Sequence, residues 1–165
     1  MANATRTLID ALQATADRLE TDVVFQWAHM GACNCGHLAQ TLTSLPREEL
    51  HRRALQRAGD WGQQSVEYCA ASGLPFDDVI GAMLEAGLAL SDIGDLEKLS
   101  SPEVLACFPT EERLALDRRH RPHVVAYMRA WAGLLEARWM AARSETSGVF
   151  ARASGAETVP ARQAR

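Results

Sequence analysis

The sequence predicts an all-α fold, a single-domain helical bundle of about six to eight helices with a long C-terminal helix. Apolar residues recur at spacings of three and four along most of the chain, and no segment alternates as a half-buried strand does. Helix start and stop signals separate these apolar stripes. The 165 residues suffice for about one domain with a sizeable core.

Three helices are predicted in the first third of the chain. The first carries one apolar stripe at spacings of four and three, formed by Leu8, Leu12, Ala16 and Leu19. The second runs from Val23 to about Met30, capped by Thr21 or Asp22. Gly31 and Gly36 then interrupt the pattern, and Asn34 is the expected N-cap of a third helix that carries Leu38, Leu42 and Leu45.

The middle of the chain is divided by start signals for short helices, in which proline occupies the first turn or acidic residues suit the helix dipole. A turn is expected at Gly59–Gly62, before a helical segment that closes near Ala71. The other expected segments run from Pro46 to about Arg57, from Pro75 to about Gly87, from Ser91 to Leu99, from Ser101 to about Phe108, and from Thr110 to a break at Pro122.

The last helix has the clearest pattern. Five large apolar residues recur at spacings of four, three, four and four, which predicts one buried seam: Val124, Met128, Trp131, Leu135 and Trp139. This helix is expected to end near Arg143. The predicted organisation is therefore a helical domain over residues 1–143, followed by a disordered tail of small and polar residues over 144–165.

Composition narrows the class of protein. The net charge of -4 argues against broad nucleic-acid binding, which needs a basic surface. No apolar run approaches the roughly 18 residues that span a bilayer, and the N-terminus lacks the apolar stretch of a signal peptide. The cytoplasm is therefore the expected location, where thiols stay reduced. The sequence is compatible with a homo-oligomer and does not identify a partner.

No other segment concentrates as many reactive side chains as the Cys/His segment His29–His37, which holds His29, Cys33, Cys35 and His37. Thiolate and imidazole suit zinc, copper and iron. These four residues are the predicted ligands, with zinc as the default ion and copper(I) as the less favoured one. A helix would place His29, Cys33 and His37 on one face, and an extended chain would do so for Cys33, Cys35 and His37. In a third geometry, a helix begins near Cys35 and its dipole favours a thiolate.

Two other functions remain open. In the first, Cys35 or Cys33 is the nucleophile of a metal-free thiol enzyme, with His37 or His29 as its base. In the second, the protein is a non-enzymatic interaction module whose cysteines are core packing, because cysteine is among the most buried residues. The sequence does not decide between enzyme and non-enzyme. The polar stretch Glu48–His51 is read as a solvated face.

The basic stretch Arg118–His123 is the docking corner of the interaction-module hypothesis. Three arginines and two histidines lie together at an expected helix junction. Guanidinium groups bind phosphate or carboxylate, so this stretch suits an anion or the acidic face of a partner. The simpler expectation is a solvated corner between helices. The interaction-module hypothesis predicts slow thiol alkylation, no bound metal and an exposed apolar groove.

Overall fold

The computed structural model describes the backbone of residues 1–153 and the side chains of residues 1–145, and every regular element in that range is a helix. The all-α prediction is confirmed. This part of the chain contains nine helices, slightly more than expected, because the shortest ones are counted separately. They are α1 (Arg6–Leu19), α2 (Asn34–Thr43), α3 (Arg47–Ala54), α4 (Trp61–Val66), α5 (Pro75–Ala86), α6 (Leu90–Lys98), α7 (Pro102–Leu105), α8 (Thr110–Ala115) and α9 (Arg121–Ala153).

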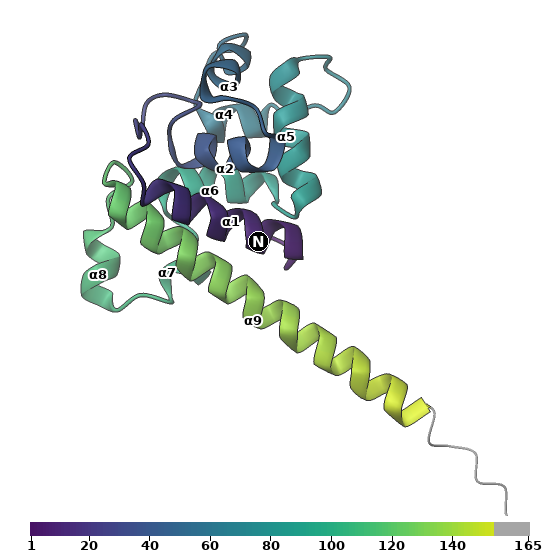
Figure 1. The fold of residues 1–165 in the computed structure, drawn as a ribbon. Coiled ribbons are helices and arrows are strands. Elements are labelled where there is room, and N and C mark those ends of the chain that lie inside the picture. The colour runs from purple at the N-terminus through teal and green to yellow at the C-terminus, as the bar shows by residue number, and fades with distance from the viewer. Residues whose placement is uncertain (154–165) are drawn as a thin grey trace, which may run out of the picture.

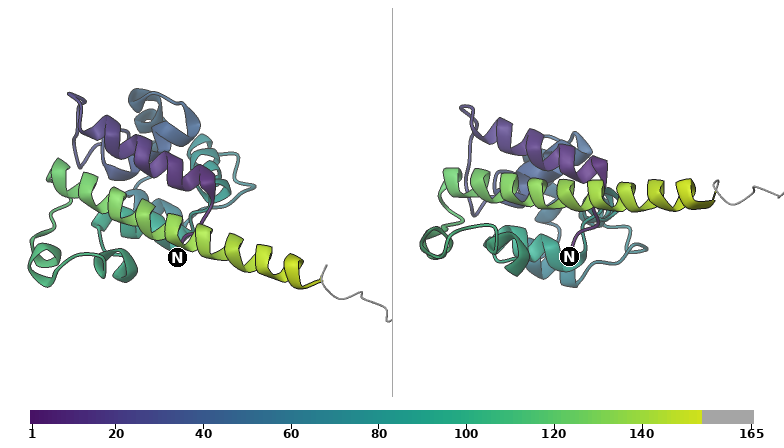
Figure 2. Two further views of the ribbon diagram at one scale, coloured as in Figure 1. Left: turned by 60° about the horizontal axis from the view of Figure 1, so that its bottom comes forward. Right: turned by 90° about the horizontal axis from the view of Figure 1, so that it is seen from below.

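The first and last helices lie side by side. Figures 1 and 2 show α1 running along the first part of α9, whose remaining turns extend beyond the other helices. The contact buries the predicted seam of α9 from Val124 to Leu135 against the apolar stripe of α1. At its edge, Arg129 Nη2 lies 2.9 Å from Asp17 Oδ1 and 2.7 Å from Glu20 Oε2. The periodicity of both helices therefore predicted their packed faces correctly.

Helix α2 occupies the centre of the molecule. It contacts α1, α3, α5 and α6, and every residue from 31 to 39 is buried. Glycine permits the closest of these approaches, because a Cβ on Gly36 would lie 2.4 Å from the Met30 carbonyl oxygen and one on Gly31 would lie 2.0 Å from that of Arg47. The Cys/His segment is therefore enclosed by the rest of the domain.

The predicted helix from Val23 to Met30 is wrong. This stretch consists of turns and irregular chain. Its backbone forms contacts that a helix could not form, since Gln26 N donates to the Ala32 carbonyl at 2.9 Å and the His37 ring nitrogen lies 3.1 Å from the Val24 carbonyl oxygen. Tertiary contacts have overridden the local apolar pattern.

Several predicted helix limits also differ from the structure. Helix α4 ends at Val66 and not near Ala71, and α8 ends at Ala115, before the predicted break at Pro122. Helix α4 begins at Trp61, inside the predicted turn, because Asp60 caps it by accepting the Gln63 N–H at 2.8 Å. Helix α9 continues past Arg143 to Ala153, since adding residues to an existing helix costs far less than nucleating one. The rest of the predicted tail, residues 154–165, lies outside the described residues. Among the described helices, none combines the length and the hydrophobicity that crossing a membrane requires.

Candidate functional site

The structure adopts the third of the predicted geometries for the Cys/His segment. Helix α2 begins at Asn34, so Cys33 is its N-cap residue and Cys35 lies in its first turn. Asn34 was the expected cap, but it stands one position inside the helix. Its side-chain amide is buried and donates to the carbonyl oxygens of Leu96 at 3.1 Å and Glu97 at 3.2 Å. The start of α2 is thereby joined to the end of α6.

Both thiols of the segment are buried, and each contacts a carbonyl oxygen. Cys33 Sγ lies 3.7 Å from the Met30 oxygen, and Cys35 Sγ lies 3.4 Å from the Ile93 oxygen. Burial raises the pKa of Cys33 to about 11 and that of Cys35 well above its usual value, although backbone N–H groups of the first turn of α2 act in the opposite direction. The thiols are therefore protonated at neutral pH, which is unfavourable for nucleophilic attack.

His37 secures the irregular loop that precedes α2. Its ring is buried, and Nε2 lies 3.1 Å from the Val24 carbonyl oxygen, so this nitrogen carries the proton. Burial lowers the pKa of His37 to about 4. Arg18 donates to the backbone carbonyl of the same residue. His37 is thus a neutral hydrogen-bond donor that holds two segments together.

His29 lies apart from the two thiols. Its half-buried ring stacks on His51 of α3, with 3.9 Å between ring centroids and 21° between ring planes. Its Nδ1 accepts the Gly31 N–H at 3.1 Å. Burial and the neighbouring His51 lower the pKa of His29. The prediction that His51 belongs to a solvated face is wrong, because α3 turns it inward onto the segment.

The four predicted ligands therefore have separate partners in the structure. Among the residues whose side chains are described, no three His, Cys, Asp or Glu side chains are grouped as a metal site requires. The thiols face carbonyl oxygens, His37 faces Val24, and His29 faces His51. Zinc or copper binding at His29, Cys33, Cys35 and His37 stays a prediction.

Glu97 is a buried charged residue that sequence reasoning missed. Its carboxylate accepts N–H groups at the start of α4, from Trp61 at 3.3 Å and from Gly62 at 3.0 Å. Burial raises its pKa, and nearby Asp60 raises it further. A signal was present, since Glu97 follows Ile93 by four positions and therefore shares the apolar face of α6.

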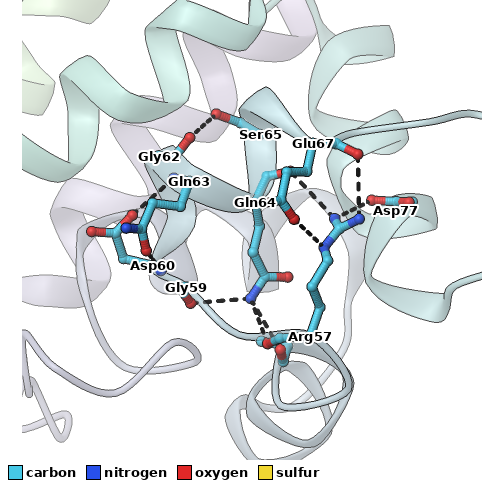
Figure 3. A network of polar contacts seen from close by, with 10 residues as sticks. Arg57, Gly59, Asp60, Gly62, Gln63, Gln64, Ser65, Glu67 and Asp77 are labelled. Carbon is cyan, nitrogen blue, oxygen red and sulfur yellow. Dashed lines mark hydrogen bonds and ion pairs between the residues drawn. The ribbon is translucent and has the colours of Figure 1, made fainter.

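The loop between α3 and α4 is fixed by a polar network (Figure 3). The buried amide of Gln64 donates to the carbonyl oxygens of Ala54, Arg57 and Gly59 at 3.0, 3.3 and 3.1 Å. Arg57 Nη2 pairs with the buried carboxylate of Asp77 on α5 at 2.8 Å. Because the Gln64 side chain satisfies the carbonyl oxygens of the loop, the backbone that leads to Asp60 is held in one position.

The basic corner, Arg118–His123, lies beside the loop that leads to α2. The guanidinium carbons of Arg118 and Arg119 lie 4.4 and 5.3 Å from the centroid of the Trp27 ring. Arg121 Nη1 donates to the carbonyl oxygens of Thr21 at 3.0 Å and Val23 at 3.3 Å. The corner is therefore ordered by an aromatic ring and by backbone oxygens.

Comparison of the chain with family models, with curated proteins and with solved structures finds no significant match. The geometry of the Cys/His segment and that of the basic corner are therefore the basis for a functional assignment.

Proposed function

We propose that the protein is a non-enzymatic helical interaction module whose basic corner docks an acidic partner. The observation that carries this proposal is the charge of the corner. Within the part of the chain whose side chains are described, Arg118, Arg119 and Arg121 form no ion pair with a carboxylate. Three uncompensated cations lie together on a chain whose net charge is -4.

The contacts of the corner orient these arginines without neutralising them. A stacked indole and a carbonyl oxygen carry no net charge, so the guanidinium groups keep theirs. Cation–π contact also limits the rotamers of Arg118 and Arg119, which lowers the entropy lost when they bind. Asp117 accepts the backbone N–H of Arg119 at 2.8 Å and thereby shapes the turn before α9. An acidic partner would find donors that are already ordered.

An apolar groove adjoins the corner. It has a volume of about 440 Å³ and lies between the end of α1 and the first turns of α9, with walls formed by Leu19, Pro122 and Val125. Three charged residues also line it, Glu20, Arg121 and Arg129, and the carboxylate of Glu20 is paired with Arg129 at 2.7 Å, which leaves Arg121 as the unpaired charge. The surface therefore suits an apolar side chain flanked by carboxylates.

The state of the thiols supports this proposal over a thiol enzyme. A catalytic thiol needs a lowered pKa and access for its substrate, whereas Cys33 and Cys35 are buried and burial raises their pKa. Their positions are those of small core side chains at a tightly packed helix start.

A defined peptide tests the proposal. The probe is a short fluorescent peptide with a central leucine flanked by glutamates, and its counterpart carries lysines instead. We expect saturable binding of the acidic peptide only, and weaker binding at higher salt, because the charges are exposed. Replacing both Arg118 and Arg119 by serine should weaken binding about tenfold or more, which corresponds to about 1.4 kcal/mol.

Arg143→Ser provides the matched control, because Arg143 also lies over a tryptophan ring, 4.6 Å from that of Trp139 on α9. This control should bind the acidic peptide like the unmodified protein. Equal binding of acidic and basic peptides, or an equal loss in the control, would refute docking at the basic corner.

A further inference from the structure

A second pocket lies beside the start of α2 and has a chemistry unlike that of the basic corner. It measures about 290 Å³ and is open to the surface between the loop before α2, α3, the α3–α4 loop and α6. Its apolar walls include Trp27, Met30 and Leu55. Its polar side chains are His51, Asp60 and Glu97. It is near the lower end of the volumes that hold small ligands.

Glu97 is the main charged group of this pocket. Its side chain is 5% exposed, and it forms no ion pair among the described residues. Both of its oxygens accept backbone N–H groups at the start of α4, which orients the carboxylate but leaves its charge uncompensated by a cation. A buried carboxylate without a counter-ion is costly, so a cation in the adjoining space would be stabilised.

Asp60 adds a second carboxylate at the same end of the pocket. It caps α4 through the Gln63 N–H at 2.8 Å and likewise pairs with no described cation. A Cβ on Gly62 would lie 3.2 Å from Glu97 Oε2 and 3.5 Å from Asp60 Oδ1, which places both carboxylates beside one residue. The network of Figure 3 holds the Asp60 backbone in place, so this pair of acceptors exists before a ligand arrives.

The other walls suit an organic body. Two ring nitrogens of residues that line the pocket, Trp27 Nε1 and His51 Nδ1, are buried and have no hydrogen-bond partner among the described residues. The ring of Trp27 already has two guanidinium groups over it, which disfavours a further cation there. A cationic group is therefore expected at the carboxylate end, with apolar atoms against Trp27, Met30 and Leu55.

We propose that this pocket binds a small organic amine, with its ammonium group at Glu97 and Asp60 and its apolar body against Trp27, Met30 and Leu55. An amine fits better than a bare metal ion, because most of the wall is apolar and no three described side chains are grouped to ligate a metal. Trp27 borders both this pocket and the basic corner, but the proposal for the pocket does not rest on docking at the corner.

Three ligands of one size test this assignment: benzylamine, neutral benzyl alcohol and anionic benzoate. Binding is followed by the indole N–H signals in proton–nitrogen NMR spectra, because Trp27 lines the pocket. We expect benzylamine to shift the Trp27 signal saturably in the millimolar range, and the other two ligands to bind at least about tenfold more weakly. Equal binding of benzyl alcohol, tighter binding of benzoate, or no saturable shift with benzylamine would overturn the proposal.

Two substitutions locate the site. Leu55 is 68% exposed at the mouth of the pocket, so Leu55→Arg should fold normally, place a guanidinium beside the carboxylates and weaken benzylamine binding about tenfold. Leu114→Arg is the matched control, since Leu114 is 83% exposed on α8 and does not line this pocket. Unchanged affinity in Leu55→Arg, or the same loss in Leu114→Arg, would contradict binding there. Glu97→Gln, measured under conditions in which the variant is folded, should abolish the preference for benzylamine over benzyl alcohol.

Discussion

Cys33 and Cys35 show how two opposing effects decide the chemistry of a side chain. Their place at the N-terminal end of α2, Cys33 as N-cap and Cys35 in the first turn, favours a thiolate through the helix dipole and the free N–H groups there. Burial opposes this and is the larger effect, so the pKa of each thiol is raised. The same residues in an open loop would be candidates for a nucleophile, whereas here they are buried in the hydrophobic core.

Thiol modification should therefore divide the four cysteines into two pairs. Cys69 and Cys107 are exposed and should react quickly with a thiol reagent at neutral pH, while Cys33 and Cys35 should react only when the protein unfolds. Mass spectrometry of partially modified native protein measures the four rates. A fast reaction at Cys33 or Cys35 would favour the thiol-enzyme hypothesis instead.

The burial of neutral His37 predicts a dependence of stability on pH. Its pKa falls from 6.5 in the unfolded chain to about 4 in the folded protein. Between these values the unfolded state binds more protons, so the free energy of unfolding decreases as the pH falls from 6.5 to 4. The full decrease from this residue is roughly 3 kcal/mol, at 1.36 kcal/mol per pKa unit.

Urea unfolding at several pH values measures this effect. His37→Gln should be less stable at neutral pH, because it alters the contact with the Val24 carbonyl, but should lose this part of the pH dependence. His120→Gln, a change at an exposed histidine, should retain it. Identical slopes for the unmodified protein and His37→Gln would mean that His37 is not the source.

The packing of helix α2 depends on glycine at the positions where backbone segments approach one another most closely. It lies between four other helices, and the chain before it turns back so closely that Gly36 faces the Met30 carbonyl. The Met30 oxygen also accepts the Trp61 indole N–H at 3.0 Å, which ties α4 to this turn. A group added at this point meets backbone and not a flexible side chain.

Gly36→Ala should therefore destabilise the protein by roughly 2 to 3 kcal/mol, because relief of the contact requires a shift of the backbone. Gly133→Ala is the control within another helix. A Cβ there meets nothing within 4 Å, so helix propensity should make that variant more stable by up to about 1 kcal/mol. Denaturant unfolding measures both changes, and equal stabilities would show that the chain before α2 is not held as closely as described.

The molecule as a whole combines an enclosed centre with a surface that carries the candidate sites. The start of the central helix holds Cys33 and Cys35, and the basic corner and the proposed amine pocket both contact Trp27 in the loop that precedes it. Figure 1 shows α9 crossing this assembly and extending past it. We expect the stability of the domain to come from the apolar core buried between the helices and not from a metal ion.

A chelator tests this last point. We expect EDTA to leave the midpoint of thermal unfolding unchanged, because the side chains of the Cys/His segment already have protein partners. Elemental analysis of protein purified without added metal accompanies the measurement. Stoichiometric zinc or copper, with a lower midpoint after its removal, would restore the four-ligand hypothesis for His29, Cys33, Cys35 and His37.

Local signals were sufficient for most of the helices. The seam of α9 follows from the spacing of its apolar residues, and α5 begins at Pro75 and ends before Gly87, as its flanking residues predict. Gly87 has a φ of 124°, which few other residues adopt, so that helix end is encoded locally. Such features depend on residues within a few positions in the sequence, so they can be predicted without the tertiary structure.

Burial of particular side chains was decided only by contacts between distant segments. The apolar residues from Val23 to Met30 match a helix in isolation, but bonds to Ala32 and His37 keep them irregular. The metal hypothesis rests on closeness in sequence, and only the tertiary structure shows that His29 contacts His51 and that Cys35 contacts Ile93. The pKa of a thiol, an imidazole or a carboxylate follows from its desolvation, and desolvation is a property of the packed molecule.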